Sequence, residues 1–125
     1  MKMAIPIPSS QDFYSTMREL KWSSTERVVA RRCYERILQQ ELDAAIQSTK
    51  ERAAKISQAS ELWELERHLT RLGKEIDRKY QYKYSTLVLF FADCVREGRL
   101  DLDDLRGLAD DKLSYIRQHA VGTAA

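Results

Sequence analysis

Residues 62–80 read LWELERHLTRLGKEIDRKY, and this stretch decides the fold class. Its apolar residues recur at spacings of 3, 4, 3, 4 and 4 positions, close to the alternation of a coiled coil. Such spacing gathers the apolar side chains on one stripe of a helix. Because most other residues are polar, this stripe, the leucine seam, requires another helix to pack against it. Its members are Leu62, Leu65, Leu69, Leu72 and Ile76, with Tyr80 at the end.

A longer helix is predicted upstream of the seam. Ser23-Ser24-Thr25-Glu26 fits a capping box, in which the serine oxygen accepts a backbone N–H and Glu26 reaches back to the cap. From there to residue 57, apolar residues recur at intervals of three and four. A helix of this length would run about 50 Å, so it must project from a small globule or find partners. Residues 57–60, SQAS, end the pattern and supply a new N-cap.

Downstream of the seam, residues 80–84 are predicted to form a bend between helices. Ser85 opens the most apolar stretch, which should form a centrally buried helix ending near Gly98, where a helix C-terminus favours a left-handed residue. Asp101 caps a last helical region that Gly107 bends or splits. Residues 1–22 are expected to form a flexible arm, and residues 121–125 a frayed tail.

Composition agrees with one small all-α domain. The chain has 125 residues, 43% of them hydrophobic and 32% charged, with only 4 Gly and 2 Pro, too few turn-forming residues for a β-sandwich. The net charge of +2 is too balanced for a protein that coats nucleic acid through many phosphate contacts. Cys33 and Cys94 are predicted to be reduced core residues. Neither an export signal nor a membrane span is evident, which places the protein in the cytoplasm.

The sequence offers no candidate for catalysis, a metal or another cofactor. Glu64, Glu66 and His68 do not share one helix face, and neither histidine has a recognisable partner. A helical enzyme of the chorismate-mutase type would need inward arginines around a ligand between long helices. The available arginines instead recur at positions that look exposed; they are Arg27, Arg31, Arg32 and Arg36.

Two features indicate binding. Trp63 lies one residue off the seam, with Arg67 one turn away, and either caps the core or anchors an interface, since Trp and Arg dominate binding hot spots. Residues 79–84, KYQYKY, interleave tyrosines with lysines. Packing of helices is the favoured role for these tyrosines, with protein docking next and base stacking on nucleic acid last.

The strings LWEL at 62–65, EIDRKY at 75–80, STLVLFFA at 85–92 and VREG at 95–98 resemble the fluorescence recovery protein family. The resemblance spans about residues 26–117 and is concentrated in 60–100. It implies a homodimer in which residues 23–80 form an extended antiparallel stalk of two long helices and residues 84–120 form a smaller helical head. The seam would then pair between subunits.

The resemblance also implies a function. Members of this family are not enzymes; they bind the photoactivated red form of the orange carotenoid protein, chiefly at its C-terminal domain. They accelerate its return to the orange form and its release from the phycobilisome, so that antenna fluorescence recovers. Neither nucleic acid nor membrane insertion is implied, and peripheral association with thylakoid membranes would occur through partners. The partner-contacting positions that it assigns are Trp63, Glu66, Arg67, Lys83, Phe91 and Lys112.

The chain departs from the family pattern at some of these positions. Glu66-Arg67 stands where the family has a His-Asp pair, which reverses a charge at a partner-contacting position, and Gly73 replaces a stalk arginine. The alternative function is therefore a similar helical scaffold whose partner surface has diverged toward another protein. A small helical enzyme and a nucleic-acid-binding dimer are remote alternatives.

Overall fold

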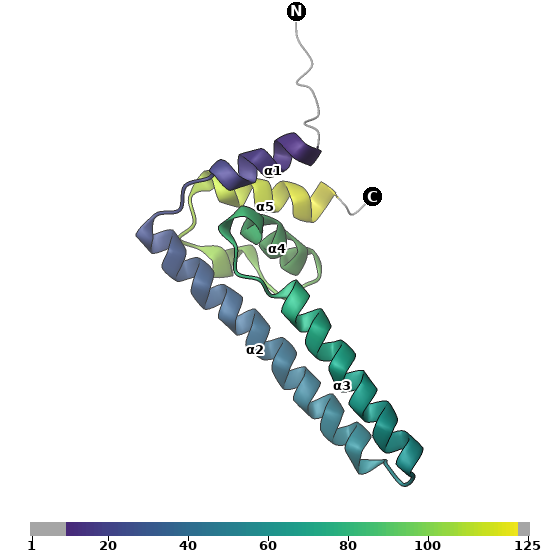
Figure 1. The fold of residues 1–125 in the computed structure, drawn as a ribbon. Coiled ribbons are helices and arrows are strands. Elements are labelled where there is room, and N and C mark those ends of the chain that lie inside the picture. Colours follow the sequence, from purple (N-terminus) through teal and green to yellow (C-terminus); the bar gives the residue numbers. More distant parts are fainter. Residues whose placement is uncertain (1–9, 123–125) are drawn as a thin grey trace, which may run out of the picture. The chain divides into compact units, whose positions relative to one another are not determined.

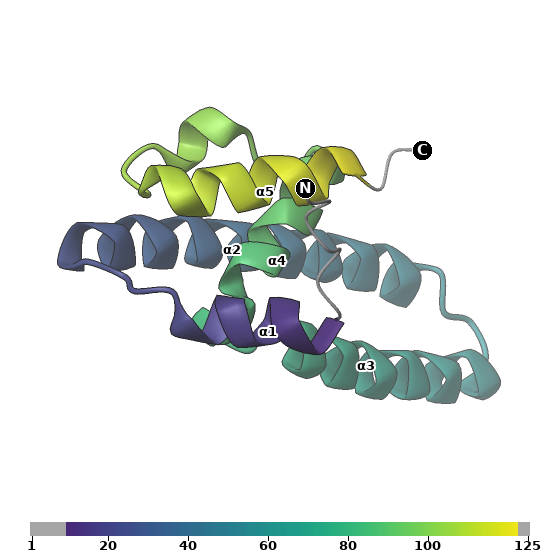
Figure 2. The same cartoon turned by 90° about the horizontal axis from the view of Figure 1, so that it is seen from above.

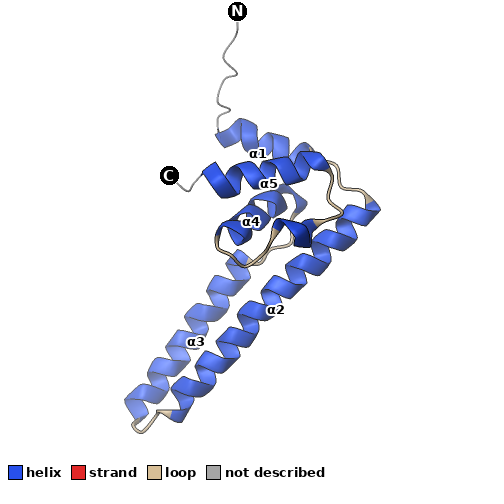
Figure 3. Cartoon of the chain, turned by 180° about the vertical axis from the view of Figure 1, so that it is seen from behind, coloured by secondary structure: helices blue, strands red, loops and turns tan. Residues whose placement is uncertain are grey.

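The structure, a computed structural model, describes residues 10–122, and within that range it is helical without any β-strand (Figure 3). The prediction of an all-α fold is thus confirmed. The elements are α1 (Ser10–Glu19), α2 (Ser24–Ala54), α3 (Ala59–Lys79), α4 (Tyr84–Arg96), the 3-10 helix η1 (Leu102–Leu105) and α5 (Asp110–Gly122) (Figure 1).

Most helix boundaries lie where the sequence places them. The Ser23 N–H donates to Glu26 Oε1 at 2.9 Å and the Glu26 N–H donates to Ser23 Oγ at 3.2 Å, so the capping box forms. The helix α3 has a second capping box, between Gln58 and Glu61. Gly98 adopts a φ of 75° just after α4, as expected for a residue that ends a helix. Residues 80–83 form the bend between α3 and α4.

The chain separates into two compact units. The first, here called the head, joins the described residues up to Arg31 with those from Tyr82 onward; the second, the hairpin, comprises residues 32–81. The first turns of α2 therefore belong to the head, whereas the sequence assigns the stalk to residues 23–80. The reason is burial, because Glu26, Val29 and Ala30 are all buried there.

In the head, α4 packs against both α1 and α5 (Figure 2). The apolar side of α4 is buried, as predicted, through Leu87, Val88, Phe91, Ala92 and Cys94. Leu105 of η1 and Ile116 of α5 complete the core. Cys33 and Cys94 are both buried, as expected of core residues.

The N-terminal segment differs from the flexible arm expected for residues 1–22. Residues 10–19 form α1, and both Met17 and Trp22 are buried in the head. The spacing of Phe13, Met17 and Leu20 indicates only a weak helical turn, because a segment this short is marginal as a helix on its own, and α1 gains its stability by packing on α4. The other expected disorder, at residues 121–125, lies mostly outside the described residues, although α5 extends to Gly122.

In the hairpin, α3 runs back along α2 in the opposite direction after the turn at residues 55–58 (Figures 1 and 3). Glu41 of α2 joins the two helices near the end of α3. Its carboxylate accepts a hydrogen bond from the Tyr80 hydroxyl and lies 3.1 Å from Lys79 Nζ. The Tyr34 and Tyr80 rings meet edge to face with centroids 5.9 Å apart.

Two glycines are expected to respond to alanine in opposite ways. Gly107 has a φ of 116°, and an added Cβ would lie 2.6 Å from Val29 Cγ2, so Gly107→Ala should destabilise the protein by about 1–3 kcal/mol. Gly73 lies inside α3 with open space around it, so Gly73→Ala should stabilise by about 1 kcal/mol. Urea unfolding at one fixed protein concentration measures both. Equal effects of the two substitutions would contradict this account.

Candidate functional site

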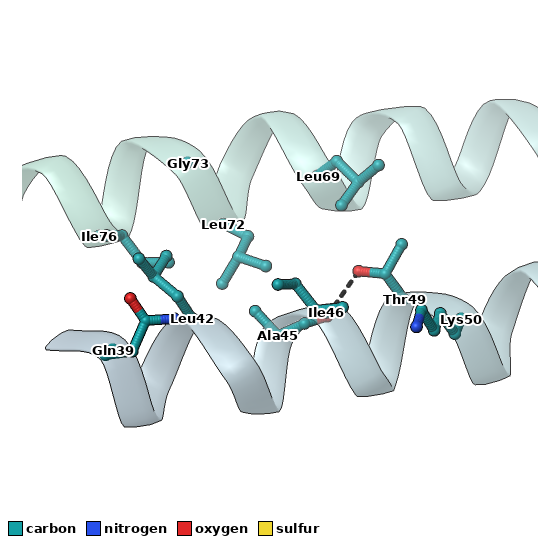
Figure 4. A pocket seen from close by; sticks show the side chains of 10 residues that line it. All are labelled: Gln39, Leu42, Ala45, Ile46, Thr49, Lys50, Leu69, Leu72, Gly73 and Ile76. Atoms are coloured by element: carbon teal, nitrogen blue, oxygen red, sulfur yellow. Dashed lines mark hydrogen bonds between the residues drawn. The ribbon is translucent and has the colours of Figure 1, made fainter. Parts of the chain in front are cut away.

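The hairpin exposes an apolar groove between α2 and α3 (Figure 4). It has a volume of about 520 Å³, and its floor and walls are mainly aliphatic. The residues that line it are Gln39, Leu42, Ala45, Ile46, Thr49 and Lys50 of α2 and Leu69, Leu72, Gly73 and Ile76 of α3. Three residues of the leucine seam thus face α2 of the same chain and still leave apolar surface open to solvent.

The apolar stripe of α3 is incompletely covered in a single chain. None of the residues of α3, all of which the structure describes, is buried. Leu62 remains 47% exposed and Leu69 40% exposed, while Leu65, Leu72 and Ile76 are half-buried. On α2, Ile46, which lines the groove, is 52% exposed. Large aliphatic side chains gathered in this way are typical of a surface that another protein chain covers.

Trp63 lies on a different face of α3. Successive helical residues are about 100° apart, which places Trp63 and Arg67 on the side opposite the seam. The Trp63 side chain is 58% exposed, so it does not cap the core of this chain. Glu66 and Arg67 are exposed as well. The structure therefore brings Trp63 and Arg67 together on one accessible face, here called the Trp63 face, with Glu66 at its edge.

The other three assigned contact residues lie in the head. Lys83 is exposed just before α4. Phe91 is fully buried in α4, and Lys112 is only 1% exposed. Both side chains are thus enclosed by the head in this conformation, and their assignment as partner contacts stays a prediction.

Lys112 instead forms a buried ion pair. Its Nζ lies 3.0 Å from Glu26 Oε2, donates to the Lys21 carbonyl at 2.5 Å and lies 5.0 Å from the centre of the Trp22 ring. Glu26 also accepts a hydrogen bond from the Ala109 N–H at 2.9 Å, next to the start of α5. The pair therefore ties the start of α2 to the start of α5.

The electrostatics of Glu26 follow from these contacts. Burial favours its neutral form, but the N–H groups of Ser23 and Ala109 and the Lys112 ammonium outweigh that penalty. Together they lower the pKa of Glu26 from 4.5 to about 2. Sequence reasoning missed this pair because the partners are far apart in the chain. The signal available was the capping glutamate itself, and such glutamates are common at exposed helix starts.

The tyrosines of residues 79–84, KYQYKY, pack against other side chains of the protein. The guanidinium of Arg31 lies 4.1 Å from the centre of the Tyr82 ring, and that of Arg27 lies 5.8 Å from the Tyr84 ring. Tyr84 also contacts the Trp22 ring, with centroids 5.2 Å apart. This arrangement agrees with the packing role and leaves these rings unsuited to stacking on bases.

Features of an enzyme or metal protein receive no support from the described residues. All four arginines considered for a helical enzyme, Arg27, Arg31, Arg32 and Arg36, are exposed. Within residues 10–122, no group of three or more His, Cys, Asp or Glu is placed to hold a metal ion. In the same range, no helix is long and apolar enough to cross a membrane.

Comparison with known proteins assigns the family. The family model described as "Photoprotection regulator fluorescence recovery protein" matches residues 22–120. The chain belongs to the fluorescence recovery protein family. The description of this family names a regulator of photoprotection, and the resemblance drawn from the sequence motifs is confirmed.

Individual members of the fluorescence recovery protein family agree in sequence and in fold. The fluorescence recovery protein of Synechocystis sp. (strain PCC 6803) is 33% identical over 99 residues, which cover 79% of this chain and 91% of that protein. The structure of the Fremyella diplosiphon protein is similar with a TM-score of 0.72 at 38% identity, covering 81% of this chain and 99% of that one. The Synechocystis structure has a TM-score of 0.73, with coverage of 81% and 99%.

Proposed function

We propose that this chain is a homodimeric regulator that binds the photoactivated red form of the orange carotenoid protein at its C-terminal domain. It accelerates the return to the orange form and the release from the phycobilisome. The observation that carries this proposal is the family match across residues 22–120, which includes α3 with its exposed Trp63. We place this action in the cytoplasm, at thylakoid membranes that the chain reaches through its partners.

The physical requirement on such a regulator is differential affinity. A protein that accelerates reversion must bind the transition state, or a compact product-like state, more tightly than the separated-domain state. The Trp63 face offers a large aromatic ring flanked by Glu66 and Arg67. An aromatic anchor beside charged groups is typical of a binding hot spot with an electrostatic rim.

The test of the proposal is kinetic. A carotenoid protein is photoactivated, and its red-to-orange recovery in the dark is followed by absorbance with and without this chain, while gel filtration detects the complex. We expect faster recovery and comigration. Recovery at the unassisted rate without comigration would reject the carotenoid protein as the partner and leave the family assignment intact.

A second candidate is a dimer of the same fold with another protein partner. Arg67 favours it, because a cation there reverses the charge that the family resemblance implies. The probe is a carotenoid protein whose own regulator has aspartate at the position of Arg67. If the carotenoid protein remains the partner, Arg67→Asp should raise the rate of association with this probe, most strongly at low salt. If the partner has changed, neither the chain nor this variant will accelerate recovery.

The dimer is expected to form through the groove of the hairpin, because α3 has a strong apolar stripe but no buried residue. Sedimentation at micromolar concentration should give twice the chain mass of 14.6 kDa. Leu69→Glu places a carboxylate in the groove and should yield monomers. Thr70→Glu, one residue further along and exposed, adds the same charge outside the groove and should leave the dimer intact. A monomeric wild type, or equal effects of the two variants, would contradict this assignment.

A further inference from the structure

The helix α1 covers an apolar face of the head. It packs on α4 (Figure 2), and Met17 at its centre is only 1% exposed. One turn earlier, the Phe13 ring lies 4.5 Å from the His119 ring and 6.3 Å from the Tyr115 ring, both of α5. Residues spaced four apart on one side of α1 therefore contact two other helices.

This cover lies outside the family match, which begins at Trp22. The solved structure from Fremyella diplosiphon is matched over 99% of its length, yet that match covers only 81% of this chain. Related proteins thus complete the same fold over a shorter length of chain. The surface under α1 therefore belongs to the part of the chain that the family shares, whereas α1 itself lies before the family match.

The helix α1 is also poorly suited to persist alone. It has 10 residues, fewer than an isolated helix needs in water, so it is helical because it is docked. Its outer side is polar, with an exposed hydrogen bond from Arg18 to Ser15. Undocking and loss of helix should therefore occur together, as a local opening at low cost.

The connection to α2 is anchored independently of α1. The Lys21 carbonyl accepts a hydrogen bond from the buried Lys112 ammonium, and the Trp22 ring is buried. When α1 leaves its site, these contacts hold the chain at residues 21–22. Opening is therefore confined to the residues before this anchor, and the covered face remains formed.

We propose that α1 is a built-in cover over a helix-binding face of α4 and α5, and that an amphipathic helix of a protein partner displaces it. The occupant seen in the structure defines the chemistry that the face accepts. A matching helix presents an aromatic residue four positions before a methionine or leucine, as Phe13 and Met17 do, with a polar outer side. Only molecules in which the face is open can bind such a helix. The apparent Kd therefore equals the Kd of the open face divided by the fraction of open molecules.

The test uses a fluorescein-labelled peptide of residues 10–20 as the probe, added to the full chain and followed by fluorescence anisotropy. Met17→Ser in the chain removes the buried anchor and should open the face, so that the peptide binds at least about tenfold more tightly than to the wild type. Tyr14→Ser removes an exposed aromatic side chain from the same helix and should leave binding at the wild-type level. A peptide that itself carries serine in place of Met17 should not bind.

Hydrogen exchange identifies the state of α1 in each variant. In the Met17→Ser chain, the amides of residues 10–19 should exchange faster and those of α4 should keep their protection. If α1 stays protected there, Phe13→Ser is added; continued protection would make α1 a fixed part of the core and overturn the proposal. Release of α1 without binding of the peptide would also overturn the proposal. So would an oligomer in which α1 of one chain packs on the α4 and α5 face of another. The probe involves no carotenoid protein, so this outcome is independent of the proposed function.

Discussion

Replacing Glu26 with glutamine is expected to lower the free energy of unfolding by about 3–5 kcal/mol, because it leaves the Lys112 ammonium buried without its main counter-charge. Lys112 Nζ lies 3.0 Å from Glu26 Oε2, and the side chains of the two residues are 1% and 7% exposed. The substitution also weakens the acceptor for the Ser23 and Ala109 N–H groups. Urea unfolding followed by circular dichroism measures the loss.

An exposed ion pair in the same unit provides the matched control. Arg106 and Asp103 lie 3.7 Å apart with side chains 83% and 90% exposed, so Asp103→Asn should cost less than about 0.5 kcal/mol. The double variant Glu26→Gln with Lys112→Met should lose less than the two single variants together, since it removes both buried charges. A loss below about 1 kcal/mol for Glu26→Gln would show that the pair does not hold the head together.

The same pair gives stability a defined dependence on pH. The pKa of Glu26 is about 2 in the folded protein, against an ordinary value of 4.5. A carboxylate with a lowered pKa contributes stability that is fully present above pH 4.5 and is lost as the pH falls toward 2. The shift corresponds to about 3 kcal/mol. Between pH 4.5 and 2, the free energy of unfolding of the wild type should therefore fall by about 3 kcal/mol more than that of the Glu26→Gln variant.

Replacing Trp63 with alanine is expected to weaken binding to the photoactivated carotenoid protein by about 2 kcal/mol or more, roughly 30-fold in Kd. The ring is 58% exposed and lies opposite the leucine seam, so its removal exposes no core and should change unfolding by less than about 0.5 kcal/mol. Gel filtration and the rate of red-to-orange recovery measure binding, and urea unfolding measures stability.

The control for Trp63→Ala is another exposed apolar residue away from the Trp63 face. Val28 is 63% exposed on α2, and Val28→Ala should change neither binding nor stability. Sedimentation of Trp63→Ala should give the same dimer as the wild type, because the groove is on the other side of α3. Unfolding or loss of the dimer would assign Trp63 a structural role, and unchanged binding would exclude the Trp63 face as the contact surface.

The sequence predicted the apolar part of the candidate site from the spacing of residues along one helix. The spacing of Leu69, Leu72 and Ile76 shows that they share a helix face, and the structure places all three in the groove. The burial of Phe91 and Lys112 has two different origins. Phe91 belongs to the apolar helix that the sequence predicts to be buried, whereas Lys112 is buried because Glu26, far away in the chain, supplies a counter-charge.

The sequence by itself determined the helices after residue 23 and most of their limits, because capping boxes, left-handed glycines and apolar periodicity act between residues close together in the chain. Ser23, Gly98 and the seam are examples. The tertiary structure alone decided the docking of α1, the ion pair of Glu26 with Lys112 and the exposure of Trp63. These depend on contacts between residues such as Lys21 and Lys112, which are 91 positions apart. Such contacts are selected by the burial of whole helix faces, and no local pattern in the chain encodes that choice.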